Sequence, residues 1–364
     1  MQEHAIPDKV LVYGMTDNPG GIEKYLTTLI QNCPKGRFDF VCDFPQIAYR
    51  DLLEEYGCSV FFIPAKGKAL KEHLSAMYRL LKAHPEYKTV YFNILDAGAA
   101  VTALVPWLLR RKIVVHSHNG STDKVRLHRL TKPLLNLEAS GFVACSCLAA
   151  NHMFTKANAK KALIVPNMVD VRAFRYNTVQ REETRASLGL LPEETVVLHI
   201  GRISLQKNPL LLADIAAELK KKSGSYKILS VGDGEMRDAL LSHIRETGTE
   251  DTVLQLGIRN DIPALYSAAD IFILPSFYEG LPIVGVEAQA SGLPCILSSR
   301  ITPEIKLTDC VSFLSPDAGA KAWADVIEQH KNDGRRSTAN ALAEENYDIA
   351  AAPKVFGALQ KLFV

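Results

Sequence analysis

Short apolar runs alternate with segments of helical periodicity over the first 170 residues. Apolar residues recur at helical spacing in several places, as in Ile22, Leu26 and Leu29, which is typical of a helix with one buried face. The alternation predicts an α/β fold with a doubly wound parallel sheet over residues 1–170. The runs that read as buried strands are "KVLVYG", "FDFVCDF", "CSVFFIP", "TVYFNI", "KIVVHSHN", "GFVACS" and "ALIVPN".

A second alternating series begins at residue 195 with "TVVLHIGR" and continues through "YKILSVGDG", "DIFILPS" and "PCILSS". It predicts a second Rossmann-like domain within residues 171–345. Residues 171–194 are polar and carry no strand pattern until their end, so we expect an irregular linker there. The tail, residues 346–364, ends in an apolar-faced helix that is long enough to cross back onto the first domain.

The net charge of +2 hides an asymmetry, since residues 1–170 carry +6 and residues 171–364 carry −4. A basic first half would suit an anionic membrane surface, although scattered solvated charges explain it equally well. The seven cysteines include no Cys-x-x-Cys pair, which favours free thiols in a reducing compartment. We expect a cytoplasmic protein, because the N-terminus lacks a signal-peptide pattern and no apolar run approaches the ~18 residues of a membrane span.

Two polar stretches follow strands of the first domain. Gly20 and Gly21 stand between a strand and a helix, outside any Gly-x-Gly-x-x-Gly or P-loop pattern. They serve either a tight turn or the close approach of an anion to the helix N-terminus. His116 and His118 end a later strand, where they are either structural or bind a hydroxyl or phosphate. No third ligand at suitable spacing supports a zinc site.

Two further stretches follow strands of the second domain. Arg202 and Lys207 in "GRISLQKNP" are suited to a diphosphate and to the charge that develops on a leaving phosphate, unless they are ordinary surface charges. Gly232 lies in "VGDGE", a glycine-rich turn at the next strand end.

The stretch "FYEGLPIVGVEAQASGLPCI" carries Glu279 in a loop and Glu287 in the helix that follows. Pro282 fits the first helical turn, and Gly292 fits the residue after the helix end. About two helical turns, ~12 Å, would separate the carboxylates in a continuous helix. We therefore expect them to hold two ends of an elongated ligand rather than to flank one bond as acid and base. The alternative for Glu287 is a helix carboxylate paired with a cation.

Taken together, these motifs resemble the retaining GT-B glycosyltransferases of family 4, the "glycosyl transferases group 1" of bacterial capsule and exopolysaccharide assembly. The phrases "HSHN", "ACSCLAANHMF", "VPNMVD" and "YEGLPIVGVEAQASGLP" carry the resemblance beside the two glutamates. It implies two Rossmann-like domains that face a central cleft, with a C-terminal helix that crosses back to the N-terminal domain.

The resemblance also implies roles for the matching residues. Arg202 and Lys207 would hold the donor diphosphate, Glu287 the ribose and Glu279 the donor sugar. His118 would lie near the sugar and the acceptor, as a catalytic residue with Arg202, Lys207 and Glu279. The remaining nucleotide-sugar contacts would come from Gly20, Gly21, Gly232, Ile258, Arg259, Gly280, Leu281, Pro282 and Ile283, with the base near Ile258 and Arg259.

The activity so implied is transfer of a hexosyl group from a nucleoside-diphosphate sugar, expected to be UDP-linked, to a saccharide or polyprenyl-diphosphate-linked acceptor. No metal is expected, since the Asp-x-Asp motif that commonly holds a metal–nucleotide complex is absent, and neither a cofactor nor nucleic acid is expected. Residues 110–112 and 124–135 are the basic candidates for contact with an anionic membrane. Alternatives are another GT-B enzyme, such as a nucleotide-sugar epimerase or a phosphorylase, or a non-catalytic subunit of a synthesis complex.

Overall fold

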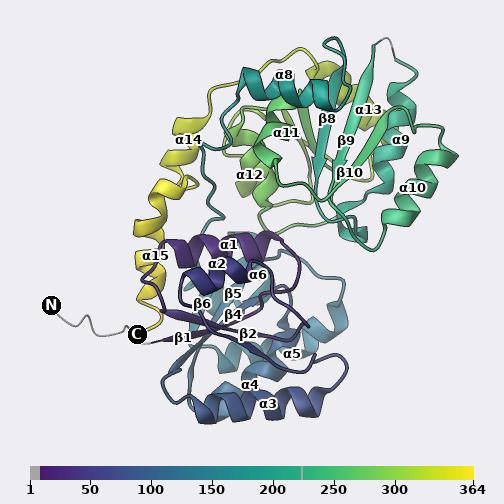
Figure 1. Cartoon of the computed structure of the whole chain (residues 1–364). Helices are drawn as coiled ribbons and strands as arrows, with labels where there is room; N and C mark the ends of the chain where they lie inside the picture. The colour runs from purple at the N-terminus through teal and green to yellow at the C-terminus, as the bar shows by residue number, and fades with distance from the viewer. Residues whose placement is uncertain (1–8, 223) are drawn as a thin grey trace. The chain divides into compact units, whose positions relative to one another are not determined.

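The computed structural model describes residues 9–222 and 224–364, which form two α/β units (Figure 1). The first unit contains the chain up to Met168 together with Ala350–Val364, and the second contains Val169–Ile349. Residues 1–8, on which part of the signal-peptide expectation depends, lie outside the described residues.

The sheet of the first unit has seven parallel strands in the order β3-β2-β1-β4-β5-β6-β7. Its central strands are buried along their whole length, which explains why they appear in the sequence as continuous apolar runs. The strands are β1 (Val10–Tyr13), β2 (Phe38–Cys42), β3 (Val60–Phe62), β4 (Thr89–Ile94), β5 (Lys112–Ser117), β6 (Gly141–Ala144) and β7 (Leu163–Ile164).

Helices cover both faces of this sheet. Figure 1 shows α3, α4 and α5 on one face and α1 and α2 on the other. The helical segments are α1 (Gly21–Gln31), α2 (Arg50–Glu55), α3 (Leu70–Ala83), η1 (Ala97–Ala99), α4 (Ala100–Leu108), α5 (Val125–Glu138), α6 (Cys147–Met153) and α7 (Lys156–Ala159).

The C-terminal segment returns to the first unit, as expected from the sequence. It comprises η4 (Ile349–Ala351) and α15 (Ala352–Gln360), so its helix begins later than residue 346. The ring of Phe356 meets Tyr25 of α1 at 6.0 Å between centroids, and Phe363 meets Tyr91 of β4 at 5.0 Å. The hydroxyl of Thr89 donates a hydrogen bond to the carbonyl oxygen of Phe363 over 3.1 Å. The chain end is therefore part of the core of this unit.

The second unit has six parallel strands in the order β10-β9-β8-β11-β12-β13. They are β8 (Thr195–Ile200), β9 (Tyr226–Val231), β10 (Val253–Gly257), β11 (Ile271–Leu274), β12 (Cys295–Ser298) and β13 (Val311–Leu314). The helical segments are α8 (Thr178–Ser187), η2 (Leu205–Lys207), α9 (Leu210–Leu219), α10 (Arg237–Glu246), α11 (Ile262–Ala268), α12 (Ile283–Ala290), η3 (Pro303–Ile305), α13 (Ala320–His330) and α14 (Ala339–Glu344).

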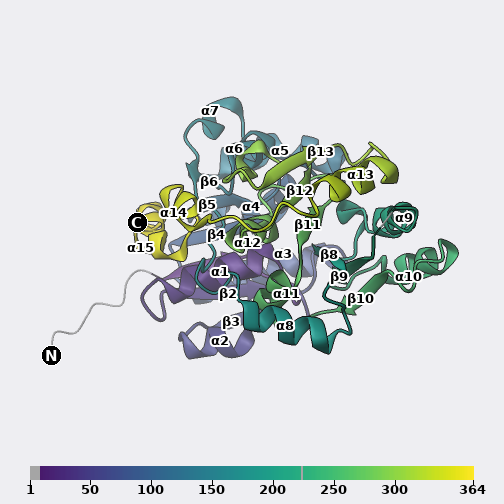
Figure 2. The same cartoon turned by 90° about the horizontal axis from the view of Figure 1, so that it is seen from above.

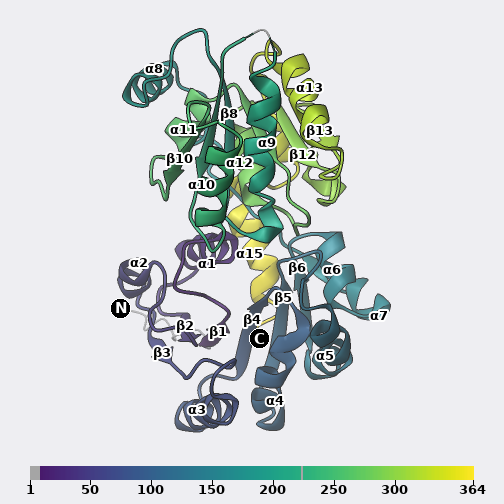
Figure 3. The same ribbon diagram turned by 90° about the vertical axis from the view of Figure 1, so that its right-hand side faces the viewer.

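Two layers of helices enclose this second sheet. α9, α10 and α13 bury a continuous apolar cluster against one face, with Trp323 of α13 fully buried in it. α11 and α12 lie on the opposite face, and Figure 3 shows α8 and α11 on the side away from α13. The chain enters and leaves this unit on paired segments, since Val169 N–H donates to Tyr347 O and Ile349 N–H donates to Val169 O.

The expectation of an irregular linker over residues 171–194 is wrong, because this segment contains α8. Asn177 caps the start of the helix, since its side chain accepts a hydrogen bond from the Gln180 amide, and the helix packs along α11 (Figure 2). Its buried residues are Thr184 and Arg185. Because arginine hydrogen bonds rather than apolar side chains attach α8, its sequence shows no apolar periodicity.

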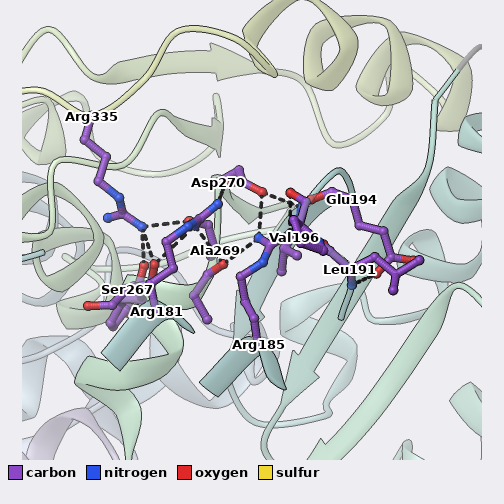
Figure 4. Close-up of polar contacts among 12 residues, drawn as sticks. Arg181, Arg185, Leu191, Glu194, Val196, Ser267, Ala269, Asp270 and Arg335 are labelled. Carbon is purple, nitrogen blue, oxygen red and sulfur yellow. Dashed lines mark hydrogen bonds and ion pairs between the residues drawn. The ribbon is translucent and has the colours of Figure 1, made fainter. Parts of the chain in front are cut away.

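Three arginines converge on the C-terminal end of α11 (Figure 4). Arg181 of α8 donates to the carbonyls of Ala268 and Ala269 at 3.0 Å, and it pairs with Asp270 at 2.6 Å. Arg185 donates to the Ala268 carbonyl at 3.1 Å and pairs with the other oxygen of Asp270. The last carbonyls of a helix have no partner within the helix, so these cations complement the helix end.

Arg335 completes this cluster from the segment that precedes α14. Its guanidinium donates to the carbonyls of Tyr266 and Ala269 at 2.7 Å and to Ser291 O at 2.8 Å. It also stacks on the ring of Tyr176. Burial, followed by repulsion from Arg181, lowers the pKa of Arg335 to about 10. The cluster thus ties α8 and the residue 335 segment to the start of β11.

None of the helices in the described residues is both long and apolar enough to cross a bilayer. None of the seven cysteines, which all lie in the described residues, forms a disulfide, and only Cys147 is exposed.

We expect Arg335→Ala to lower the free energy of unfolding of the second unit by about 3 kcal/mol, because it leaves several buried carbonyls without a donor. Urea denaturation followed by Trp323 fluorescence in a Trp107→Phe background measures this. The neighbouring Arg336→Ala is the control, since Arg336 is exposed and its change should cost less than about 0.5 kcal/mol. Equal effects of the two substitutions would contradict the role assigned to Arg335.

Candidate active site

The candidate site of the second unit lies where the strand order reverses. β8 has β9 on one side and β11 on the other, and all strands are parallel. In open α/β sheets, ligands bind outside the carboxyl ends of the strands at such a switch point. The loop after β8 carries Arg202 and Lys207, and the loop after β11 carries Glu279.

Lys207 and Glu279 form a short ion pair across these two loops. Lys207 Nζ lies 2.5 Å from Glu279 Oε1, and both side chains are largely buried. Gln206 Nε2 donates to the other carboxylate oxygen at 3.3 Å and to Tyr278 O at 2.9 Å. The sequence-predicted cation and the first of the two glutamates are therefore brought together, with Gln206 as an unpredicted partner.

Hydrogen bonds to backbone carbonyls fix the two loops against each other. The Phe277 amide donates to Gln206 O at 2.8 Å, and Asn208 Nδ2 donates to Pro275 O at 3.4 Å. Asn208 adopts a left-handed conformation with φ of 53°, which asparagine tolerates better than most residues, and it turns the chain from η2 into α9. Lys207 is thus held by the path of the backbone as well as by its carboxylate.

A buried histidine lies near Lys207. His199 on β8 is fully buried, and burial followed by repulsion from Lys207 lowers its pKa to about 3. A neutral imidazole leaves the positive charge of Lys207 to be balanced by Glu279 and by any bound anion.

Arg202 takes a different position from the one expected for a diphosphate clamp with Lys207. Its side chain is two-thirds exposed and pairs with Glu235 at 3.0 Å. Glu235 belongs to the glycine-rich turn after β9, in which Gly232 has a φ of +129°. A Cβ on Gly232 would lie 2.1 Å from Gly201 O, so the packing of β8 and β9 ends requires this glycine whether or not a ligand binds.

Glu287 lies on α12 and is only 7% exposed. The hydroxyl of Tyr266 on α11 donates to its Oε2 at 3.1 Å and to Val284 O at 2.9 Å. The helix ends as predicted at Gly292, which has a φ of 72°, and the Gly292 and Leu293 amides bond back to Gln289 and Ala288. Tyr266 is a second partner that sequence analysis missed.

The segment between the two glutamates forms the start of α12. Pro282 precedes the first helical residue, Ile283, and no side chain caps this N-terminus. Gly280, Leu281 and Pro282 are buried, and Ile283 is partly exposed. Because the first amides of a helix have no partner within the helix and favour negative charge, this end of α12 is suited to an anionic or hydroxyl-rich ligand.

The residues expected near the base follow β10. Ile258 is 67% exposed, which is unusual for a large apolar side chain. Arg259 pairs in bidentate geometry with Asp261, with N–O distances of 2.8 and 2.6 Å. The ion pair lowers the pKa of Asp261 and raises that of Arg259. Their order along the chain places these residues beyond the carboxyl end of the strand next to β9.

In the first unit, the switch point lies between β1 and β4. Gly20 and Gly21 follow β1, and His118 follows β5. Neither glycine has a positive φ, and a Cβ on Gly21 would meet nothing within 4 Å. A Cβ on Gly20, in contrast, would lie 2.8 Å from Glu23 Oε2, so the packing of the turn itself favours glycine there, and only at Gly21 does the turn not require one. His118 Nε2 bonds to Asn93 Oδ1 at 3.0 Å.

Within the residues that the structure describes, His, Cys, Asp and Glu side chains form no group of three that could hold a metal ion. The expectation of a metal-independent reaction stays a prediction.

Sequence comparison identifies the family. A profile of the family described as glycosyl transferases group 1 matches residues 180–348. The putative glycosyltransferase EpsF of Bacillus subtilis (strain 168) is 30% identical, over 95% of this chain and 94% of that protein. The chain belongs to the group 1 glycosyltransferases.

A second relative is the UDP-Gal:alpha-D-GlcNAc-diphosphoundecaprenol alpha-1,3-galactosyltransferase of Escherichia coli, which is 31% identical over 66% of each chain. Among solved structures, HepE of Anabaena in complex with UDP-glucose superposes with a TM-score of 0.81, at 23% identity over 97% of this chain and 99% of that one. This likeness confirms the GT-B fold of this group 1 enzyme.

A double-mutant cycle tests the Lys207–Glu279 pair. Lys207→Met should lower the free energy of unfolding by about 3 kcal/mol, because it leaves a buried carboxylate without its cation. Adding Glu279→Leu should recover much of this loss and give a coupling energy of about 2 kcal/mol or more. Urea denaturation followed by Trp323 fluorescence in the same Trp107→Phe background provides the measurement.

The matched control for this cycle is the exposed pair of Lys221 and Glu218 on and beside α9. Its coupling energy should stay below about 0.5 kcal/mol. A coupling between Lys207 and Glu279 of the same small size would show that the two side chains do not interact as described.

Proposed function

We propose that this group 1 glycosyltransferase is a retaining, metal-independent hexosyltransferase of family 4 that uses a UDP-sugar. The acceptor would be a saccharide or a polyprenyl-diphosphate-linked sugar in bacterial surface polysaccharide synthesis. The observation that carries the proposal is the Lys207–Glu279 pair at the β8/β11 switch point, followed by Glu287 on α12. The UDP-glucose bound by HepE and the lipid-linked acceptor named for the Escherichia coli relative support it.

Charge on the leaving diphosphate accounts for the placement of the cations. As the bond from the anomeric carbon to the diphosphate oxygen breaks, negative charge grows on that oxygen. Lys207 would stabilise this charge from a partly buried position, where electrostatic interactions are stronger than in water. Arg202 would exchange its exposed partner Glu235 for the diphosphate, since a guanidinium pairs well with phosphate oxygens.

The two glutamates would recognise different ends of the donor. Glu279 would accept hydrogen bonds from the sugar, with the backbone groups of Gly280, Leu281 and Ile283 beside it. Glu287, oriented by Tyr266, would accept hydrogen bonds from the ribose. Ile258 and the backbone at Arg259 would lie against the base.

The acceptor hydroxyl would attack from the face that the diphosphate leaves. The new bond joins the acceptor oxygen to the anomeric carbon, and the hydroxyl proton passes to an oxygen of the departing phosphate. The configuration is therefore retained without a covalent enzyme intermediate. His118 would not take this proton, because burial lowers its pKa to about 3 and makes it a weak base.

We expect UDP and one UDP-sugar to raise the apparent melting temperature, because they bind only the native state. Glu287→Gln should weaken the shift from both ligands, whereas Glu279→Gln should weaken mainly the shift from the UDP-sugar and reduce transfer. Lys207→Ala and Arg202→Ala should each reduce turnover at least tenfold. A thermal-shift screen of nucleotide sugars, followed by a transfer assay, measures these effects.

Glu246→Gln is the control for the glutamate variants, because Glu246 ends α10 at the protein surface. Near-normal turnover in both cation variants would refute the electrostatic assignment. Release of free UDP from the donor without any acceptor would favour an epimerase, and no binding of any nucleotide sugar would favour a non-catalytic subunit.

We also propose that the first unit contacts the cytoplasmic face of an anionic membrane. The exposed side chains of α4 and α5 include Leu108, Leu130 and Leu137, which are 66–80% exposed, beside Trp107 at 40%. A pocket of about 750 Å³ between the ends of these helices is lined by Trp107, Leu108, Arg110, Arg111, Lys112, Leu137, Glu138, Ala139 and Ser140. Apolar side chains beside cations are suited to acyl chains and anionic headgroups.

Liposome co-sedimentation tests this surface. Vesicles with about one-third phosphatidylglycerol should retain the protein at low salt, and Leu130→Glu combined with Arg110→Glu should abolish this. Neutral phosphatidylcholine vesicles are the control, and Lys227→Glu on the second unit should leave binding unchanged. Equal binding of the wild type to neutral and anionic vesicles would overturn the electrostatic part of the proposal.

A further inference from the structure

His118 is the outer member of a row of buried aromatic and polar side chains in the first unit. Its ring lies 3.8 Å from that of His116, measured between centroids. His116 Nδ1 is 2.6 Å from the hydroxyl of Tyr91, which is in turn 2.8 Å from the hydroxyl of Tyr25. The ring of Tyr25 packs against the rings of both histidines. The position of the His118 ring is therefore fixed by packing.

Every titratable member of this row is neutral at physiological pH. Burial lowers the pKa of His118 to about 3 and holds that of His116 well below its usual range. Burial raises the pKa of Tyr25 and Tyr91 well above that of a free phenol. A neutral imidazole carries one N–H donor and one lone-pair acceptor, so its tautomer decides what it offers to a ligand.

Asn93 is the hydrogen-bond partner of the His118 ring. It lies near the end of β4, beside His116 of β5 in the sheet register, and it is 1% exposed. Its Oδ1 is 3.0 Å from His118 Nε2. With the Asn93 amide in this orientation its oxygen can only accept, so Nε2 carries the proton and Nδ1 keeps its lone pair. Nδ1 has no hydrogen-bond partner among the described residues, and the side chain is partly exposed.

We propose that Asn93 is a positioning residue that holds His118 as the Nε2–H tautomer, so that Nδ1 accepts a hydrogen bond from a substrate hydroxyl. This inference rests on the proposed glycosyl transfer, which supplies the substrate. It adds to that proposal a defined role for His118, whose Nδ1 is a hydrogen-bond acceptor. The Nδ1–H tautomer would present a donor at the same position, and a hydroxyl that donates a hydrogen bond there would lose its acceptor. The hydroxyl belongs either to the donor sugar or to the acceptor.

The tautomer can be measured without substrate. A long-range proton–nitrogen correlation spectrum of the full chain separates protonated from unprotonated ring nitrogens, and His118→Gln assigns the signals. The wild type should show Nε2 protonated and Nδ1 unprotonated. A protonated Nδ1 would overturn the proposal, because it would mean that the Asn93 amide is turned and donates to the ring.

Variants then separate positioning from stability. Asn93→Asp keeps an acceptor at this place and should keep the Nε2–H tautomer, whereas Asn93→Leu should give a mixture of tautomers and about a tenfold loss of kcat/KM. A pure Nε2–H signal in Asn93→Leu would show that Asn93 does not set the tautomer of His118. Thr102→Val is the matched control, since it removes an equally buried hydrogen bond to another histidine, His73, and should leave the His118 signals unchanged.

The kinetic split identifies the source of the hydroxyl. A rise in KM for the nucleotide sugar in Asn93→Leu assigns it to the donor sugar, and a rise in KM for the acceptor assigns it to the acceptor. Unchanged kinetics with a changed tautomer would overturn the proposal. Because the spectrum needs no substrate, a correct tautomer in a protein that transfers no sugar would refute the proposed function and leave the role of Asn93 in setting the tautomer intact.

Discussion

The carboxyl ends of parallel strands all lie at one edge of a sheet. This constraint determines where the candidate functional residues of the molecule can lie. The order of β8, β9 and β11 places two loops beside each other at the switch point of the second unit. Lys207 comes from one of these loops and Glu279 from the other, although 72 residues separate them along the chain. Without the crossover between β8 and β11, neither side chain would have its partner.

The burial of charged side chains is a second constraint on the structure. Charged side chains that leave water need partners, and the second unit meets this need in two ways. Around Asp270, carbonyls and one carboxylate surround the guanidinium groups, so the arrangement is saturated and structural. At Lys207 and Glu279, a single ion pair and Gln206 satisfy groups that retain further hydrogen-bonding capacity. The first arrangement supports the fold, and the second is the one that we propose binds the donor.

Much of the fold could be predicted from the sequence, because buried parallel strands appear as apolar runs and the helix end at Gly292 has a distinct local signal. The family resemblance was equally accessible through the two glutamates. The polar helix α8 was not, since hydrogen bonds from Arg181 and Arg185 attach it rather than an apolar face. The partners Gln206, Tyr266 and Asn93 were also missed, because a side-chain contact between distant segments has no local pattern. Likewise, nothing in "GRISLQKNP" indicates that Arg202 turns to Glu235 while Lys207 turns to Glu279.

The segments that enter and leave the second unit are hydrogen-bonded to each other, because Val169 pairs with Tyr347 and Ile349. In topological terms, the second unit is an insertion into the first, with its two ends held side by side. Removal of its 181 residues from the chain would leave the two cut ends of the first unit close together. Conversely, a truncation at the far C-terminus damages the unit that folds around the N-terminal half, because Phe356 and Phe363 complete that core. Residues that are synthesised after the whole second unit are thus required by the first unit.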